Sequence, residues 1–161
     1  MNILKTVGAG ALLVAMTSSS AFAVDDDISF TGLILDSCTI VVATDGVLAA
    51  NAETSQLSSK NAGGIPGTAT IVTNSDASVV EVIAPVAWTQ KPLNAGNDTT
   101  FTTSYSIPVG LVTSGEVDGT VQTGLGFGPS ELVINATADK GAGAYSGGQY
   151  ELVATLRCVA Q

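Results

Sequence analysis

The chain has 161 residues with 14 acidic and 5 basic side chains, no histidine and a formal charge of −9. Hydrophobic residues make up 45 % of the sequence and charged residues only 12 %, a balance that excludes a disordered chain. Five cations cannot form the basic surface that nucleic-acid binding requires. The absence of histidine also excludes histidine-based catalysis and histidine metal ligands.

Residues 1–23 have the pattern of a secretory signal peptide. Lys5 supplies a positive charge, residues 7–16 form an apolar run, and residues 21–23 (AFA) form an A-x-A cleavage motif. Such a run spans only about half of a bilayer core, which argues against a membrane anchor. We therefore expect an exported mature chain without a transmembrane segment. It would form one domain over residues 24–161 and be either soluble or assembled at the cell surface.

Cys38 and Cys158 are the two cysteines of the chain. In an oxidising compartment an isolated pair predicts one disulfide, and no histidine or third cysteine is present to complete a metal site. Closing a loop of about 120 residues would stabilise the fold by roughly 4 to 5 kcal/mol in the chain-entropy model.

Abundant Val and Thr with frequent Gly and Pro favour short strands over helices. The pattern predicts an all-β, antiparallel β-sandwich with strands over Ile28–Val42, Thr68–Thr73, Ser78–Ala87, Phe101–Thr113, Leu132–Ala138 and Gln149–Val159. Pro108 suits an edge or a strand break. Residues 51–67 are expected to be a loop, with a short helical turn at 49–53. Residues 114–130 are expected to form a long loop or a weak hairpin.

The first and last predicted strands both alternate with a period of two. The apolar face of the first would hold Ile28, Phe30, Ile34, Cys38, Ile40 and Val42, with a bend at Asp36-Ser37. The apolar face of the last would hold Tyr150, Leu152, Leu156 and Cys158. Since both cysteines lie on apolar faces, the terminal strands should be neighbours or face each other.

No catalytic residue, cofactor or metal site is predicted. The sequence at 58–60 (SSK) lacks the S-x-x-K spacing of a Ser-Lys pair, and residues 124–129 (GLGFGP) fail the phosphate-loop pattern. Calcium at Asp98 or Asp118 has no EF-hand spacing behind it. A hydrolase would have to pair carboxylates from the predicted strands, the candidates being Glu81, Glu131 and Glu151.

The two ends of the mature chain resemble chaperone/usher fimbrial (pilus) subunits. Residues 28–34 (ISFTGLI), followed by Cys38, resemble the first strand of that family, which reads apolar-x-Phe-x-Gly-x-apolar. Residues 143–145 and 148–156 resemble its closing strand, in which a glycine is fourteenth from the C-terminus, as Gly148 is here.

The resemblance implies an immunoglobulin-like sandwich that lacks one strand and is completed by strand donation, first from a periplasmic chaperone and then, at an outer-membrane usher, from another fibre subunit. The function it implies is a structural or adhesive subunit of a bacterial surface fibre. The alternative is a monomeric periplasmic or secreted binding module with a complete sandwich. The residues implied in subunit interaction are Ile28, Phe30, Gly32, Ile34, Gly148, Tyr150, Leu152 and Leu156.

Three features depart from the family pattern. The penultimate residue is Ala160 rather than an aromatic, and the second cysteine is Cys158 rather than one near the middle of the chain. Only Val24–Asp27 precedes the first predicted strand, and four residues reach about 13 Å. A donor segment would therefore have to be Ile28–Leu35 itself, separated from the body by the bend at Asp36-Ser37.

Overall fold

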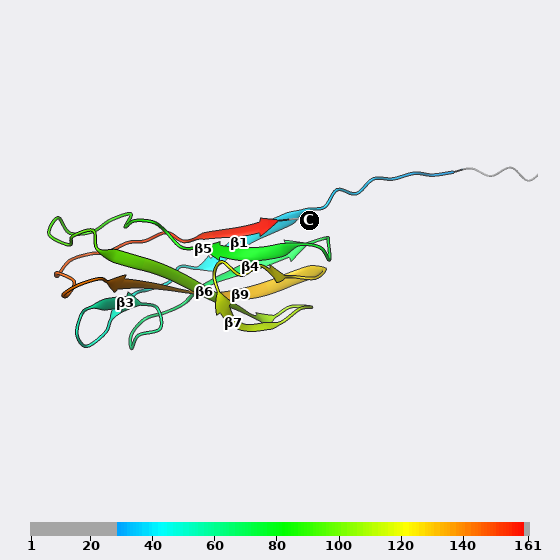
Figure 1. The fold of residues 1–161 in the computed structure, drawn as a ribbon. Coiled ribbons are helices and arrows are strands. Elements are labelled where there is room, and N and C mark those ends of the chain that lie inside the picture. Colours follow the sequence, from blue (N-terminus) through cyan, green and yellow to red (C-terminus); the bar gives the residue numbers. More distant parts are fainter. Residues whose placement is uncertain (1–28, 160–161) are drawn as a thin grey trace, which may run out of the picture. The chain divides into compact units, whose positions relative to one another are not determined.

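The computed structural model describes residues 29–159, and the predicted signal peptide and Ile28 lie outside that range. Within it the chain is all-β with antiparallel strands, and it forms the predicted β-sandwich (Figure 1). No helix among the described residues is long and apolar enough to cross a membrane.

The larger sheet is organised around β9 (Gly128–Lys140). One edge of β9 pairs with β6 (Thr99–Val109), and β6 pairs in turn with β7 (Ser114–Asp118). The other edge of β9 pairs with two strands in succession, so that the order on this side is β1, β4, β9, β3, β2. The remaining bounds are β1 Cys38–Thr44, β4 Gly67–Thr73, β3 Gln56–Ser58 and β2 Ala49–Ala50.

The smaller sheet has three strands in the order β10 (Thr155–Val159), β5 (Val79–Ile83) and β8 (Thr123–Gly124). In Figure 1 the red β10 lies alongside β5 and β1. The main core lies between the sheets and consists of fully buried side chains from both, namely Ile71, Val80, Val82, Tyr105, Ile107, Leu125 and Leu132. The hydroxyl of Tyr105 is 2.9 Å from the carbonyl oxygen of Val80, so the one polar group of that ring has a partner.

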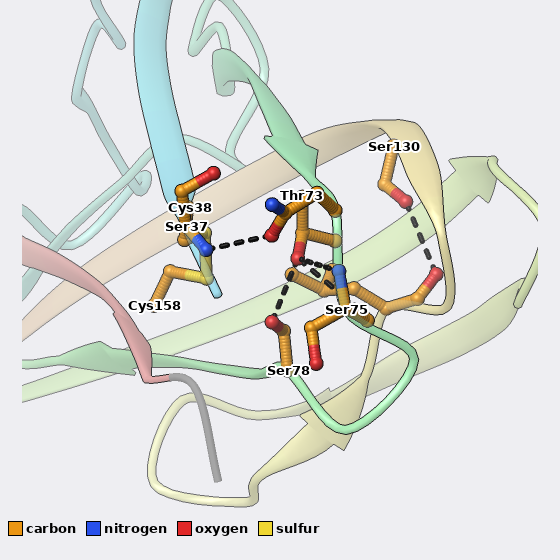
Figure 2. Close-up of a disulfide and its surroundings, with 9 residues drawn as sticks. Ser37, Cys38, Thr73, Ser75, Ser78, Ser130 and Cys158 are labelled. Atoms are coloured by element: carbon orange, nitrogen blue, oxygen red, sulfur yellow. Dashed lines mark hydrogen bonds between the residues drawn. A yellow bond between two sulfur atoms is a disulfide. The ribbon is translucent and has the colours of Figure 1, made fainter. Parts of the chain in front are cut away.

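Cys38 and Cys158 form the predicted disulfide, with their Cα atoms 6.3 Å apart. Cys38 opens β1 in the larger sheet and Cys158 lies in β10 of the smaller one, so the first and last strands face each other as expected. Figure 2 shows the bridge beside the turn after β4, where Thr73 and Ser78 place their hydroxyl oxygens 2.7 Å apart.

The first predicted strand is shorter than expected. Regular pairing begins only at Cys38, and residues 29–37 belong to no strand, so Phe30, Gly32 and Ile34 are not strand residues. The cause is the length of the neighbouring strand: Cys38 pairs with Thr73, the last residue of β4, and beyond this pair a single backbone bond, from the amide of Asn74 to the carbonyl oxygen of Ser37, continues the ladder.

The last strand is likewise shorter than predicted. It begins at Thr155, so Tyr150 and Leu152 precede it, and Glu151 makes only an isolated bridge to Gln90. The predicted alternation is nevertheless present, because the even-numbered side chains from 150 to 158 are half-buried and the odd-numbered ones are exposed.

Other predicted boundaries also change. The helical turn at 49–53 is wrong, since β2 and a turn occupy it, and β3 lies inside the predicted loop at 51–67. Residues 114–130 contain β7 and β8, which pair with β6 and β5 and not with each other. Pro108 does not break β6; the register shifts between Ser106 and Val109 where the ring removes an amide donor.

Candidate strand-binding groove

An open groove of about 620 Å³ runs along one side of the sandwich. One wall is the second half of β1 with the loop that follows it, including Val42 and Leu48. The other wall is the stretch that leads into β10, from Tyr150 to Leu156. The described strands on the two sides leave their outer backbone edges unpaired, since β1 pairs only with β4 and β10 only with β5. The groove therefore combines apolar side chains with two edges that can accept a strand.

The floor of the groove is made by small and medium apolar side chains of the larger sheet. Gly67 and Ala69 of β4 and Ile134 and Ala136 of β9 all contribute to it. Gly67 and Ile134 are direct partners in the β4–β9 ladder, so the floor is held by regular pairing. Small residues at these points leave space that larger side chains would fill.

The β1 wall shows that this part of the sandwich lacks a cover. Ile40 and Val42 have the parity of the half-buried Cys38, yet Ile40 is 37 % exposed and Val42 is 63 % exposed. The described part of the smaller sheet has three strands, and its edge strand β10 approaches β1 near the Cys38–Cys158 disulfide without burying these two side chains. The face of β1 expected in the core is thus core-like in sequence and open in the structure.

The charged groups of the groove are Asp45 and Glu151, both acidic. Lys and Arg are absent from its lining among the described residues. An uncharged or basic apolar segment therefore fits this lining better than an acidic one, because like charges would repel it.

Tyr150 connects the groove with an aromatic cluster beneath it. Its ring centroid lies 5.0 Å from that of Trp88, which is in turn 5.0 Å from Phe101. The hydroxyl of Tyr150 donates to the carbonyl oxygen of Ser146 at 2.9 Å. Burial raises the pKa of the neighbouring Tyr145, which belongs to the same cluster. Since Tyr150 is shared, Trp88 fluorescence should report on what enters the groove.

The glycine that the fimbrial resemblance singles out, Gly148, lies just before this wall. Its φ is +146°, and a Cβ atom there would meet Pro92 Cγ at 2.4 Å. A larger residue would push the two segments apart, so glycine sets how closely residues 148–150 approach the Pro92 loop.

Residues 29–35 carry the other feature that the sequence singled out. Phe30, Leu33 and Ile34 are 92 %, 85 % and 85 % exposed, and Leu35 is 74 % exposed. These side chains contribute to no buried core cluster in the structure. Soluble proteins seldom leave several neighbouring large apolar side chains in water unless the segment binds something. Ile28, the remaining residue predicted for this segment, lies outside the described residues.

Several carboxylates are bound to other groups, among them Glu81, one of the three hydrolase candidates. Arg157 Nη1 donates to Glu81 Oε1 at 3.0 Å. The Lys140 ammonium, 2.7 Å away, lowers the pKa of Asp98, and hydrogen bonds from Thr120 lower that of Asp118. Among the described residues no three His, Cys, Asp or Glu side chains gather as metal ligands.

Sequence reasoning missed half of the groove. Tyr150, Leu152 and Leu156 were expected at an interaction surface, and all three line it. The opposite wall beyond β1 and the floor were not expected, because their side chains come from regions interpreted as a loop or as ordinary core. No local sequence pattern identifies the residues of this wall and floor. They can be recognised only from the strand register, which brings β1, β4 and β9 side by side.

Comparison with known proteins found no similar protein. No protein-family model, curated protein or solved structure matches the chain. The fimbrial resemblance therefore stays a prediction carried by the residues at the two ends of the chain, and the groove and the exposed segment have to be interpreted from their own geometry.

Proposed function

We propose that this protein is an exported structural or adhesive subunit of a bacterial surface fibre, in which one copy donates residues 28–35 to the groove of the next. The observation that carries the proposal is the presence, in one chain, of an apolar groove between two unpaired strand edges and of an exposed apolar segment that belongs to no strand. An added strand would complete an immunoglobulin-like sandwich by β-augmentation.

The energies indicate that side chains alone would not hold such a contact. Burying Phe30 and Ile34 contributes about 1.5 to 3 kcal/mol each. Association costs about 4 to 15 kcal/mol in lost translational and rotational freedom. Each backbone hydrogen bond adds about 0.5 to 1.5 kcal/mol. A ladder of several bonds along the unpaired edge of β1 or of β10 is therefore required.

The disulfide and the signal-like N-terminus support export. A single disulfide across the ends of the domain is typical of proteins that fold outside the reducing cytosol. In the periplasm an uncovered groove and an uncovered apolar segment would promote aggregation. A periplasmic chaperone that fills the groove and an outer-membrane usher that exchanges it for the next subunit would meet that need.

The proposal is tested on chain 24–161 recovered from the periplasm, with mass measured by light scattering and fibres sought by negative-stain microscopy. Phe30→Asp with Ile34→Asp should abolish assembly, because these same-parity side chains would face the groove. The matched control is Leu33→Asp with Leu35→Asp, which changes the opposite face and should leave assembly intact. None of the four substituted side chains contributes to either core cluster, so both variants should fold.

A wild-type protein that stays monomeric and binds no peptide of residues 28–35 would refute the subunit proposal. The volume of the groove, about 620 Å³, also lies within the range of about 300 to 1,000 Å³ typical of ligand pockets. A stable monomer whose Trp88 fluorescence responds to an uncharged apolar small molecule, and not to the peptide, would favour the monomeric binding module instead.

A further inference from the structure

The N-terminal segment is long enough to reach the groove of its own molecule. If residues 35–37 formed a three-residue hairpin loop, Ile34 would lie opposite Cys38 and the antiparallel register would place Phe30 opposite Val42. Val42 is a groove residue, and side chains directly opposite each other share one face of a sheet. Phe30 and Ile34 would then point inward, so this register would complete the sandwich in cis.

A two-residue loop at Asp36-Ser37 would not serve the same purpose. It would pair Leu35 with Cys38 and shift the register by one residue, which turns Phe30 and Ile34 to the outer face. Only polar Thr31 and Ser29 would then face the groove half of β1. A self-completed subunit therefore depends on a turn over residues 35–37.

In the structure those same three residues are hydrogen-bonded to the turn that follows β4. The backbone amide of Ser37 donates to Asn74 Oδ1 at 2.6 Å, and Asn74 Nδ2 donates to the carbonyl oxygen of Leu35 at 3.0 Å. The backbone amide of Asn74 donates to the carbonyl oxygen of Ser37 at 3.3 Å, and Ser75 Oγ donates to Asp36 Oδ2 at 3.2 Å. Figure 2 shows Ser37 and Cys38 beside the turn that contains Ser75. We call these four bonds the Asn74 clamp.

The clamp prolongs the β1–β4 ladder beyond its last regular pair, Cys38 with Thr73. It binds residues 35–37 on the β4 side, whereas a hairpin would have to turn them toward the free edge of β1. The residue at position 37 also disfavours the hairpin. A three-residue hairpin loop ends with a residue in the left-handed region, which favours glycine, and this position is Ser37.

From this geometry we infer that the Asn74 clamp, together with a non-glycine residue at position 37, directs the N-terminal segment away from its own groove and so makes it a donor to a second copy of the chain. The inference rests on the proposed function. It adds that the segment binds a second copy of the chain instead of its own groove, and that the Asn74 clamp causes this preference. Asn74 is in this sense a positioning residue, since it acts on the donor without entering the groove.

The test compares chain 24–161 with three variants: Asn74→Ala, Ser37→Gly with Asn74→Ala, and Asn94→Ala as a control. Asn94 also bonds through its side chain, to Ser146, but lies far along the chain in an exposed loop. Light scattering gives the ratio of monomer to assembled protein, and hydrogen exchange gives the protection of amides 29–34. A synthetic peptide of residues 28–35, followed through Trp88 fluorescence, reports whether the groove is free.

Loss of the side-chain bonds should raise the monomer ratio of Asn74→Ala roughly 5- to 30-fold. The double variant should be mainly monomeric, with protected amides at 29–34 and a groove closed to the peptide. Adding Phe30→Asp to the double variant should reopen the groove to the peptide without restoring assembly. The Asn94→Ala control should behave like the wild type.

A double variant that assembles as the wild type does, with amides 29–34 unprotected whenever it is monomeric, would overturn the inference while leaving the proposed function standing. A wild type that neither assembles nor binds the peptide would instead refute the proposed function. If alanine at position 74 prevents folding, Asn74→Asp with Ser37→Gly replaces it, because the carboxylate still accepts from the backbone amide of residue 37 and cannot donate to the carbonyl oxygen of Leu35. That variant should also become monomeric, and its unchanged assembly would overturn the inference in the same way.

Discussion

Removing the disulfide should cost this domain about 5 kcal/mol of stability. The variant is Cys38→Ala with Cys158→Ala, which opens a loop with a sequence separation of 120. In the chain-entropy model such a loop restricts the unfolded chain by about 16 cal/mol/K, which is about 4.9 kcal/mol at 25 °C. Small domains have a free energy of unfolding of only about 5 to 15 kcal/mol, so the variant should be close to unfolding. Its thermal unfolding midpoint should be roughly 10 to 20 °C lower.

The measurement is urea unfolding followed by Trp88 fluorescence, in the Phe30→Asp, Ile34→Asp background so that assembly does not contribute. Reduction of the disulfide-containing protein should reproduce the loss, and the same reductant should leave the cysteine-free variant unchanged. A loss below about 2 kcal/mol would refute the reasoning, because it would mean that the unfolded chain is already restricted near its ends or that the bridge strains the native sandwich.

Three further predictions concern the core, the groove and the dependence on pH. Tyr105→Phe should cost about 1 to 2 kcal/mol in the free energy of unfolding by urea. The single proton of the buried hydroxyl lies within reach of the carbonyl oxygens of Val80 and Val121, at 2.9 and 2.7 Å, and its oxygen can accept from the Thr123 hydroxyl at 2.7 Å. Ala136→Leu should fill the groove floor and abolish binding of the 28–35 peptide, whereas Ala43→Leu on the exposed part of β1 should not. The hydrogen bond and charge of Lys60 lower the pKa of Glu116 from its usual 4.5. The pair therefore stabilises the fold at a pH above 4.5, and this contribution is lost as the pH falls through the lowered pKa. Glu116→Gln should remove this dependence when the free energy of unfolding is measured against pH.

The sequence was most informative where one local pattern had one physical meaning. The period-two alternation of residues 150–158 predicts which side chains turn inward, and their burial follows it. The pairing of Cys38 with Cys158 follows from their number, their parity and the expected compartment. Both predictions need only the pleat of a strand and the chemistry of thiols.

Boundaries that depend on a distant partner were predicted poorly. β3 has only three residues and is a strand because β9 lies beside it, with Leu57 opposite Ala138. β6 continues past Pro108 because β9 remains available on the other side of the register shift. Strand propensity is set largely by such neighbours, so a sequence without its register cannot locate these ends.

The difference from the predicted strand at residues 29–37 has another cause and is itself informative. Alternating Phe30 and Ile34 indicate side chains that require burial in a sheet, and the pattern carries no information on which molecule supplies that sheet. In the structure the same side chains are almost fully exposed, while Val42, whose face should be covered, lies open in the groove. A buried-strand pattern without a sheet and a core face that stays exposed, both in one chain, are what the proposed strand donation requires. Local sequence rules tend to fail at functional sites, so this mismatch favours testing residues 29–35 and the groove together.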